Sequence, residues 1–154
     1  ISGSLMFIDE MMRIKGILEE FGHAVHTPPM EVPDGQGGMI SVSDRYKASK
    51  EAGGGDVLIW DMREMAMKNF LKKVEWADVL IVANEDKRGA AGYIGANTLI
   101  EMGVAFHLDK PIYLKNEVPD LPCKEEIWGM KPTILNGDFS CFASVDSVLA
   151  KKTV

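Results

Sequence analysis

Several common signatures of function are absent from this chain of 154 residues. The two cysteines, Cys123 and Cys141, lie outside any CxxC motif, and the three histidines form no HxxxH or HExxH pattern. The sequence therefore supports neither a metal site nor a disulfide framework, and we expect no metal and no cofactor. No apolar run approaches the roughly 20 residues that a bilayer-spanning helix needs, and no signal peptide is visible. These features favour a cytoplasmic protein with reduced thiols.

An excess of positive charge is also absent, because 17 lysines and arginines stand against 23 acidic residues and give a net charge of −6. A protein that binds polymeric nucleic acid or an anionic membrane is usually basic, so we expect neither as a partner. A small anionic ligand stays open, since backbone N–H groups at a helix N-terminus can hold one. The GxGxxG and GxxxxGK[ST] fingerprints of nucleotide-binding loops do not occur.

The residues that are present predict one globular α/β domain. Apolar residues make up 46% of the chain and charged residues 26%, and the length fits a single domain over 1–154. Apolar spacing predicts strands at 1–4, 23–26, 78–83, 110–114 and 132–135, and helices at 7–21, 58–77, 97–108, 124–129 and 145–151. The run at 78–83 shows no alternation, which is typical of a strand buried on both faces. We expect a three-layer Rossmann-like or flavodoxin-like fold with a mostly parallel sheet of about five strands.

Residues 27–56 interrupt this alternation with prolines and glycines, including Gly53-Gly54-Gly55. A short helix around 43–52 is the one regular element that the pattern suggests there. Long loops in compact domains are usually functional or disordered. We therefore expect a partly mobile excursion, either a lid over a substrate or a disordered connection.

Two loops follow predicted interior strands, and ligands of open α/β sheets bind at the carboxyl ends of such strands. The first loop contains Gly3 and Ser4, whose small side chains, hydroxyl and adjoining helix N-terminus suit a phosphate or a sugar hydroxyl; the hydroxyl of Ser2 is a second candidate. The alternative for Ser4 is a helix N-cap, and the two roles are compatible. The second loop spans 84–97.

Four residues of the second loop and the helix after it are candidate site residues. Asn84 ends the central strand and is a ligand contact or a turn former. Tyr93 stacks on a base or covers the core. Asn97 is predicted as the N-cap and as a polar contact, and Glu101 lies one turn further among apolar neighbours. A carboxylate in that setting is a catalytic candidate, with a solvated helix residue as the alternative.

Four segments, taken in order, resemble the nucleoside 2-deoxyribosyltransferase superfamily, which includes 2′-deoxynucleoside 5′-phosphate N-hydrolases. They are Ile1-Ser2-Gly3-Ser4, Glu75-Trp76-Ala77-Asp78-Val79-Leu80-Ile81-Val82, Glu101-Met102-Gly103-Val104-Ala105-Phe106 and Lys110-Pro111-Ile112. The resemblance covers about 1–26 and 70–135.

The resemblance implies cleavage of an N-glycosidic bond, with hydrolysis and transfer both open. Glu101 matches the glutamate that attacks C1′ of the deoxyribose and forms a covalent glycosyl-enzyme, as in a retaining glycosidase. The loop at Gly3 and Ser4 matches the region that holds the sugar or its 5′-phosphate. The resemblance also implies a homodimer or a larger homo-oligomer, in which 128–131 contacts a partner's site.

Two positions depart from the family pattern. Phe70 and Gly95 stand where the family places an Asp and an Asp or Ser, so the general acid is not identified. Candidate proton donors are other acids of the two segments that flank the central strand: Asp61, Glu64, Glu85 and Asp86. The second hypothesis is therefore a degenerate module that binds a nucleoside or nucleotide without turnover. A phosphoribohydrolase is a weaker third reading, because its PGGxGTxxE motif is absent. Because acidic residues are in excess, phosphate binding would depend on local backbone donors. We therefore slightly favour a nucleoside over a nucleotide as the ligand.

Overall fold

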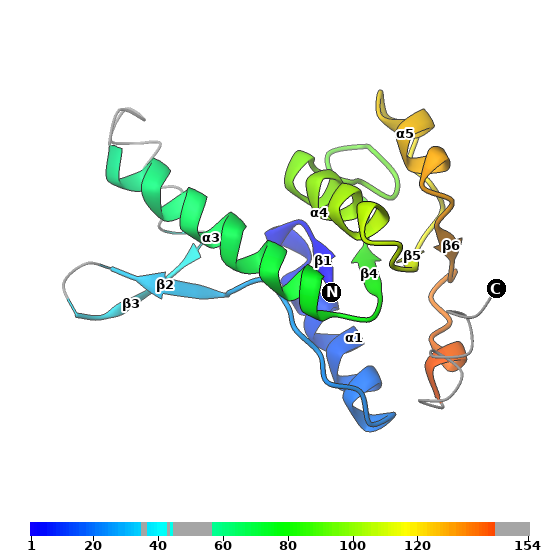
Figure 1. The fold of residues 1–154 in the computed structure, drawn as a ribbon, viewed down its shortest axis with the longest axis horizontal. Coiled ribbons are helices and arrows are strands. Elements are labelled where there is room, and N and C mark those ends of the chain that lie inside the picture. The colour runs from blue at the N-terminus through cyan, green and yellow to red at the C-terminus, as the bar shows by residue number, and fades with distance from the viewer. Residues whose placement is uncertain (35–36, 43, 45–56, 144–154) are drawn as a thin grey trace.

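The chain folds into an α/β structure around a parallel sheet in a computed structural model that describes residues 1–34, 37–42, 44 and 57–143 (Figure 1). The sheet has four strands in the order β1-β4-β5-β6, where β1 is Ser2–Gly3, β4 is Leu80–Ala83, β5 is Ile112–Leu114 and β6 is Thr133–Ile134. All three strand pairings are parallel. The parallel α/β architecture predicted from the sequence is confirmed.

Helices connect these strands much as the apolar spacing predicts. In the described residues they are η1 (Leu5–Phe7), α1 (Ile8–Glu20), α3 (Val57–Trp76), α4 (Ala96–His107), α5 (Lys124–Gly129) and η2 (Ser140–Phe142). Helix α1 ends one residue before the predicted end, and Gly22, which follows the C-cap residue Phe21, adopts a φ of +90°.

Buried side chains form two apolar clusters that share β4. Leu80 and Val82 pack in one cluster with side chains of α3, α4 and α5, whereas Ile81 and Ala83 pack in the other with side chains of α1. All four residues of β4 are buried, as expected for a strand covered on both faces. Strand β4 is therefore packed on both faces up to the residue at which the next loop begins.

The strand predicted at 23–26 is wrong, because this segment forms no ladder in the structure. Strand β1 pairs with β4 over only Ser2 and Gly3. Side-chain contacts hold the segment instead: the rings of His26 and Trp76 lie 4.7 Å apart, and His23 Nε2 is hydrogen-bonded to the carbonyl of Phe142 at 2.7 Å. These contacts bind it to α3 and η2.

The excursion at 27–56 contains an antiparallel hairpin that the sequence analysis missed. Its strands are β2 (Glu31–Pro33) and β3 (Met39–Ser41). The hairpin and the first turns of α3 project together from the same side of the sheet (Figure 1). The helix expected around 43–52 and the one at 145–151 lie outside the described residues. Among the helices that are described, none has the length and apolar character needed to cross a bilayer.

Candidate active site

The candidate site is assembled where two neighbouring parallel strands end. Because β1 and β4 pair in parallel, the loops that follow them lie at the same edge of the sheet. Gly3 permits a close approach, since a Cβ at this position would meet the carbonyl oxygen of Ala83 at 2.9 Å. Side chains as far apart in sequence as Ser2 and Glu101 thus come into contact.

Glu101 is carried into this edge by α4, which begins at Ala96 and packs against both β1 and β4. Its carboxylate is largely buried, and the hydroxyl of Ser2, which is fully buried, donates a hydrogen bond to Oε2. Burial raises the pKa of the Glu101 carboxyl to about 7, against the lowering effect of the Ser2 hydrogen bond. Glu101 is therefore not the solvated helix residue of the alternative interpretation.

The Ser4 loop receives a lysine that the sequence analysis did not single out. Ser4 caps η1 by accepting a hydrogen bond from the amide of Met6 at 3.4 Å. Its Oγ also accepts one from Lys87 Nζ at 2.9 Å, and the same ammonium lies 4.6 Å from the ring centroid of Tyr93. Lys87 makes no ion pair with the described carboxylates, so it carries positive charge into this edge.

This placement corrects the argument from net charge. From the acidic composition we expected that a phosphate at the loop of Gly3 and Ser4 would find backbone donors alone. Lys87 supplies a local cation there, which net charge cannot reveal. The physical reason to prefer nucleosides over nucleotides is therefore lost.

Asn84 braces two loops. Its side chain is fully buried, and Nδ2 donates to the carbonyls of Gly92, Asn116 and Glu117 at 3.3, 3.1 and 3.0 Å. Its Oδ1 accepts from the amide of Asn116 at 2.9 Å. With both ends of the amide engaged by backbone groups, Asn84 shapes the site rather than offering a free polar group to a ligand.

A half-buried lysine, Lys115, connects three elements through ion pairs. Lys115 follows β5 and pairs with Glu10 of α1 at 2.7 Å and with Glu85 of the loop after β4. Hydrogen bonds from Arg13 and Lys115 lower the pKa of Glu10 to about 2, the Arg13 bond having the larger effect. The pairs of Lys115 with Glu10 and Glu85 could not be predicted from the sequence, because these residues are far apart along the chain and follow no motif.

Asn97 is not the N-cap of α4. The helix begins at Ala96, and Gly95 occupies the cap position without a side-chain hydrogen bond. Asn97 is exposed in the first turn. Gly103 of the same helix is not at a close contact, since a Cβ there would meet no atom within 4 Å.

None of the four candidate proton donors, all of which lie in the described part of the chain, contacts Glu101 through a hydrogen bond. Phe70 is 6% exposed and packs in the apolar cluster of α3, α4 and α5. Glu64 pairs with Lys68 on the exposed side of α3, Glu85 pairs with Lys115, and Asp86 accepts from the amide of Gly92. None of these acids, nor Asp61, is hydrogen-bonded to Glu101.

Comparison with known proteins gives this chain no relatives. A scan against protein-family models, a search of curated proteins and a search of solved structures each returned no match. Its chemistry must be argued from the geometry of the site. Within the described residues, no group of three or more His, Cys, Asp and Glu side chains is placed to hold a metal ion.

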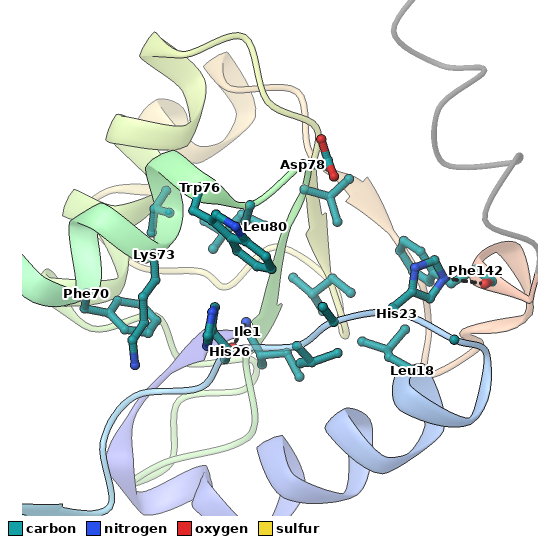
Figure 2. A pocket seen from close by; sticks show the side chains of 17 residues that line it. Ile1, Leu18, His23, His26, Phe70, Lys73, Trp76, Asp78, Leu80 and Phe142 are labelled. Carbon is teal, nitrogen blue, oxygen red and sulfur yellow. Dashed lines mark hydrogen bonds between the residues drawn. The ribbon is translucent and has the colours of Figure 1, made fainter.

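One cavity in the described part of the chain does not have Glu101 in its lining. It has a volume of about 270 Å³ and lies at the amino end of β4, between α3 and the 23–26 segment (Figure 2). Trp76, His26 and Leu80 line it, and its walls are mostly apolar. Because ligands of parallel sheets bind at the carboxyl edge, we place the candidate site at Glu101 and Ser4 instead.

Proposed function

We propose that this protein cleaves the N-glycosidic bond of a 2′-deoxynucleoside or its 5′-monophosphate through a covalent glycosyl-Glu101 intermediate. The observation that carries the proposal is the largely buried Glu101 carboxylate, hydrogen-bonded to Ser2 at the carboxyl edge of the sheet. Ser4 and Lys87, which follow β1 and β4 at the same edge of the sheet, are hydrogen-bonded to each other. The chain's resemblance to the deoxyribosyltransferase superfamily also supports the proposal.

In the proposed first step, a carboxylate oxygen of Glu101 donates an electron pair to C1′ of the sugar. The C1′–N bond breaks, and its electron pair leaves with the base, which takes up a proton from water. The negative charge of the carboxylate stabilises the oxocarbenium-like transition state, and the carboxylate oxygen then completes its bond to C1′. In the second step, water or another base attacks C1′, and the Glu101 carboxylate leaves, so both hydrolysis and transfer remain within the proposal.

The Ser4 loop would hold the 5′ end of the substrate. Lys87 offers an ammonium group, and Ser4 a hydroxyl, to the 5′-hydroxyl or 5′-phosphate of the sugar. Gly3 lets β1 lie close to Ala83 of β4, and Tyr93 presents an aromatic ring beside Lys87. A 5′-monophosphate gains a charge-assisted contact here that a nucleoside lacks.

Base release tests the proposal. The protein is incubated with each 2′-deoxynucleoside and each 5′-monophosphate, and free base is followed by chromatography. We expect release by the wild type, loss of release in Glu101→Gln, and no change in Glu125→Gln, an exposed glutamate on α5. A quenched reaction should add a deoxyribosyl group, or its phosphate, to the peptide that contains Glu101. A Glu101→Gln variant as active as the wild type would overturn the mechanism.

The pH dependence follows from the pKa of Glu101. The attacking group must be ionised, and burial raises its pKa to about 7. The rate of base release should therefore rise with pH through the neutral range and level off above it. A rate that is already maximal at pH 5 would contradict a Glu101 nucleophile.

One observation favours a second candidate function, a binding module without turnover. Phe70 fills with a buried ring the position where the family carries an acid, so that position supplies no proton to the base. The expected result for a binding module is a rise of Tm with a nucleotide and no release of base. For a binding module, the nucleotide should also raise the Tm of the wild type and of Glu101→Gln by the same amount.

We further propose that the whole chain is one three-layer Rossmann-like domain of a cytoplasmic homo-oligomer. Apolar clusters on both sides of the parallel sheet support the layered arrangement. Large apolar side chains exposed on α3, α4 and α5 support the oligomer: Trp60, Met65, Ile100, Phe106 and Trp128.

A further inference from the structure

Ser2 is the one side chain that contacts the Glu101 carboxylate through a hydrogen bond in the described residues. It belongs to β1, is fully buried, and pairs in the sheet with Val82 of β4. Its hydroxyl donates to Oε2 of Glu101. No described residue donates to Oε1. The two carboxylate oxygens are therefore in different environments, one anchored to a strand and one free.

A serine in this position is fixed more firmly than a loop residue. The backbone of Ser2 is held in the parallel ladder, and the next residue, Gly3, lies against the carbonyl of Ala83. A hydrogen bond from a group with so little freedom fixes the orientation of the carboxylate as well as its charge. The sequence analysis assigned the Ser2 hydroxyl to a ligand, whereas here it is committed to Glu101.

We infer that Ser2 is a positioning residue, which anchors Oε2 of Glu101 and leaves Oε1 as the oxygen that attacks C1′. This inference rests on the proposed function. In the first step Oε1 forms the bond to C1′ while the base leaves with the electron pair of the C1′–N bond. In the second step the bond from Oε1 to C1′ breaks, and the Ser2 hydrogen bond stabilises the carboxylate that is restored.

Few other groups act on this carboxylate. Burial favours the neutral form of Glu101, and the Ser2 hydrogen bond is the largest effect that favours the ionised form. On α3, Lys73 donates to the carbonyl of Thr27 at 3.4 Å. Ser2 is thus the main group that favours the ionised form of Glu101 near neutral pH.

The decisive experiment titrates Glu101 directly. Glutamate side chains are labelled with ¹³C, and the Glu101 carboxyl signal is assigned by its absence in Glu101→Gln. Loss of the hydroxyl in Ser2→Ala should move the midpoint upwards by about one pH unit. Ser4→Ala is the matched control, because Ser4 lies two residues away and contacts Lys87 instead. In Ser4→Ala the titration midpoint of Glu101 should equal that of the wild type.

Base release adds a readout of orientation. The acid limb of kcat should move upwards in Ser2→Ala by the same interval, so that kcat at pH 6 falls about tenfold while KM changes little. Ser2→Cys retains a weak hydrogen-bond donor of similar size, so its kcat at pH 6 should lie between the values of the wild type and Ser2→Ala. It also keeps the test valid if Ser2→Ala does not fold.

The outcomes separate the two proposals. An unchanged Glu101 midpoint and an unchanged kcat profile in Ser2→Ala, with an active wild type and an inactive Glu101→Gln, would overturn the role of Ser2 alone. A wild type that releases no base would overturn the proposed function, whatever the titration shows.

Discussion

Glu101, the proposed nucleophile, is a residue at which stability and the proposed function are opposed. A carboxylate at the start of an apolar helix face is costly to bury, and its hydrogen bond with Ser2 offsets only part of that cost. The shift of its pKa from 4.5 to about 7 corresponds to about 3 kcal/mol of unfavourable free energy for the ionised form. Residues that destabilise a fold in this way are common at sites of chemistry.

The sign of this effect predicts the pH dependence of stability. Between pH 4.5 and about 7 the folded state holds a proton on Glu101 that the unfolded state has released, so the free energy of unfolding falls as pH rises. Glu101→Gln removes the ionisable group and keeps an acceptor for Ser2. We expect it to be more stable than the wild type by about 2–3 kcal/mol at pH 8 and nearly equal to it at pH 4.5. Urea unfolding at both pH values measures this, and a gain of equal size at both would contradict it.

Substitution of Asn84 and of Asn97, the two asparagines predicted as ligand contacts, should change the free energy of unfolding by very different amounts. Asn84→Ala leaves three buried or part-buried backbone carbonyls without their donor and should cost about 2–4 kcal/mol. Asn97→Ala alters an exposed side chain and should stay within about 0.5 kcal/mol of the wild type. Urea denaturation of both variants checks this, and equal losses would show that Asn84 is not a brace.

Single residues show where sequence reasoning succeeds and where it stops. Glu101 could be predicted because an acid among apolar neighbours is a local pattern. The partnership of Lys87 with Ser4 could not, because it depends on how a 12-residue loop between β4 and α4 folds over another loop. The exposed place of Asn97 depends on a shift of the helix start by one residue, which local propensity does not resolve.

At the scale of elements, the close approach of β1 and β4 fixes the site. Gly3→Ala would place a methyl group 2.9 Å from the carbonyl oxygen of Ala83. We expect a loss of about 1–3 kcal/mol and a matching loss of base release, because the strand that carries Ser2 must shift.

Gly103→Ala is the matched control for Gly3→Ala. Its methyl group would meet open space on α4, and alanine has the higher helix propensity, so stability should rise by about 0.5–1 kcal/mol. Thermal unfolding of the two variants compares them. If Gly103→Ala is the more damaging, the face of α4 at Gly103 is a contact surface that the isolated chain does not show.

Elements were predicted well where apolar periodicity is strong. Helix α5 has the predicted bounds, and helices α3 and α4 each begin within one residue of their predicted first residue. The strand at 23–26 was wrong because alternating side chains alone do not form a strand without a neighbouring edge to pair with. The β2–β3 hairpin was missed because its strands are short and lie in a segment dominated by proline and glycine.

At the scale of the whole molecule, exposed apolar side chains predict self-association. Trp60 and Phe106 are 57% and 53% exposed, on α3 and α4 respectively. Sedimentation at micromolar concentration should therefore give a mass above that of one chain, and Phe106→Lys should shift the population towards monomer. A wild type that sediments as a monomer at every concentration would contradict the proposed oligomer.

The central claim of this account is that Glu101 forms a bond to the sugar. Mass spectrometry of the protein after acid quench, during incubation with 2′-deoxynucleoside 5′-monophosphates, tests it most directly. The account predicts a deoxyribosyl phosphate adduct on the peptide that contains Glu101, present in the wild type and absent in Glu101→Gln. Release of base without an adduct on that peptide, and with undiminished rate in Glu101→Gln, would contradict it.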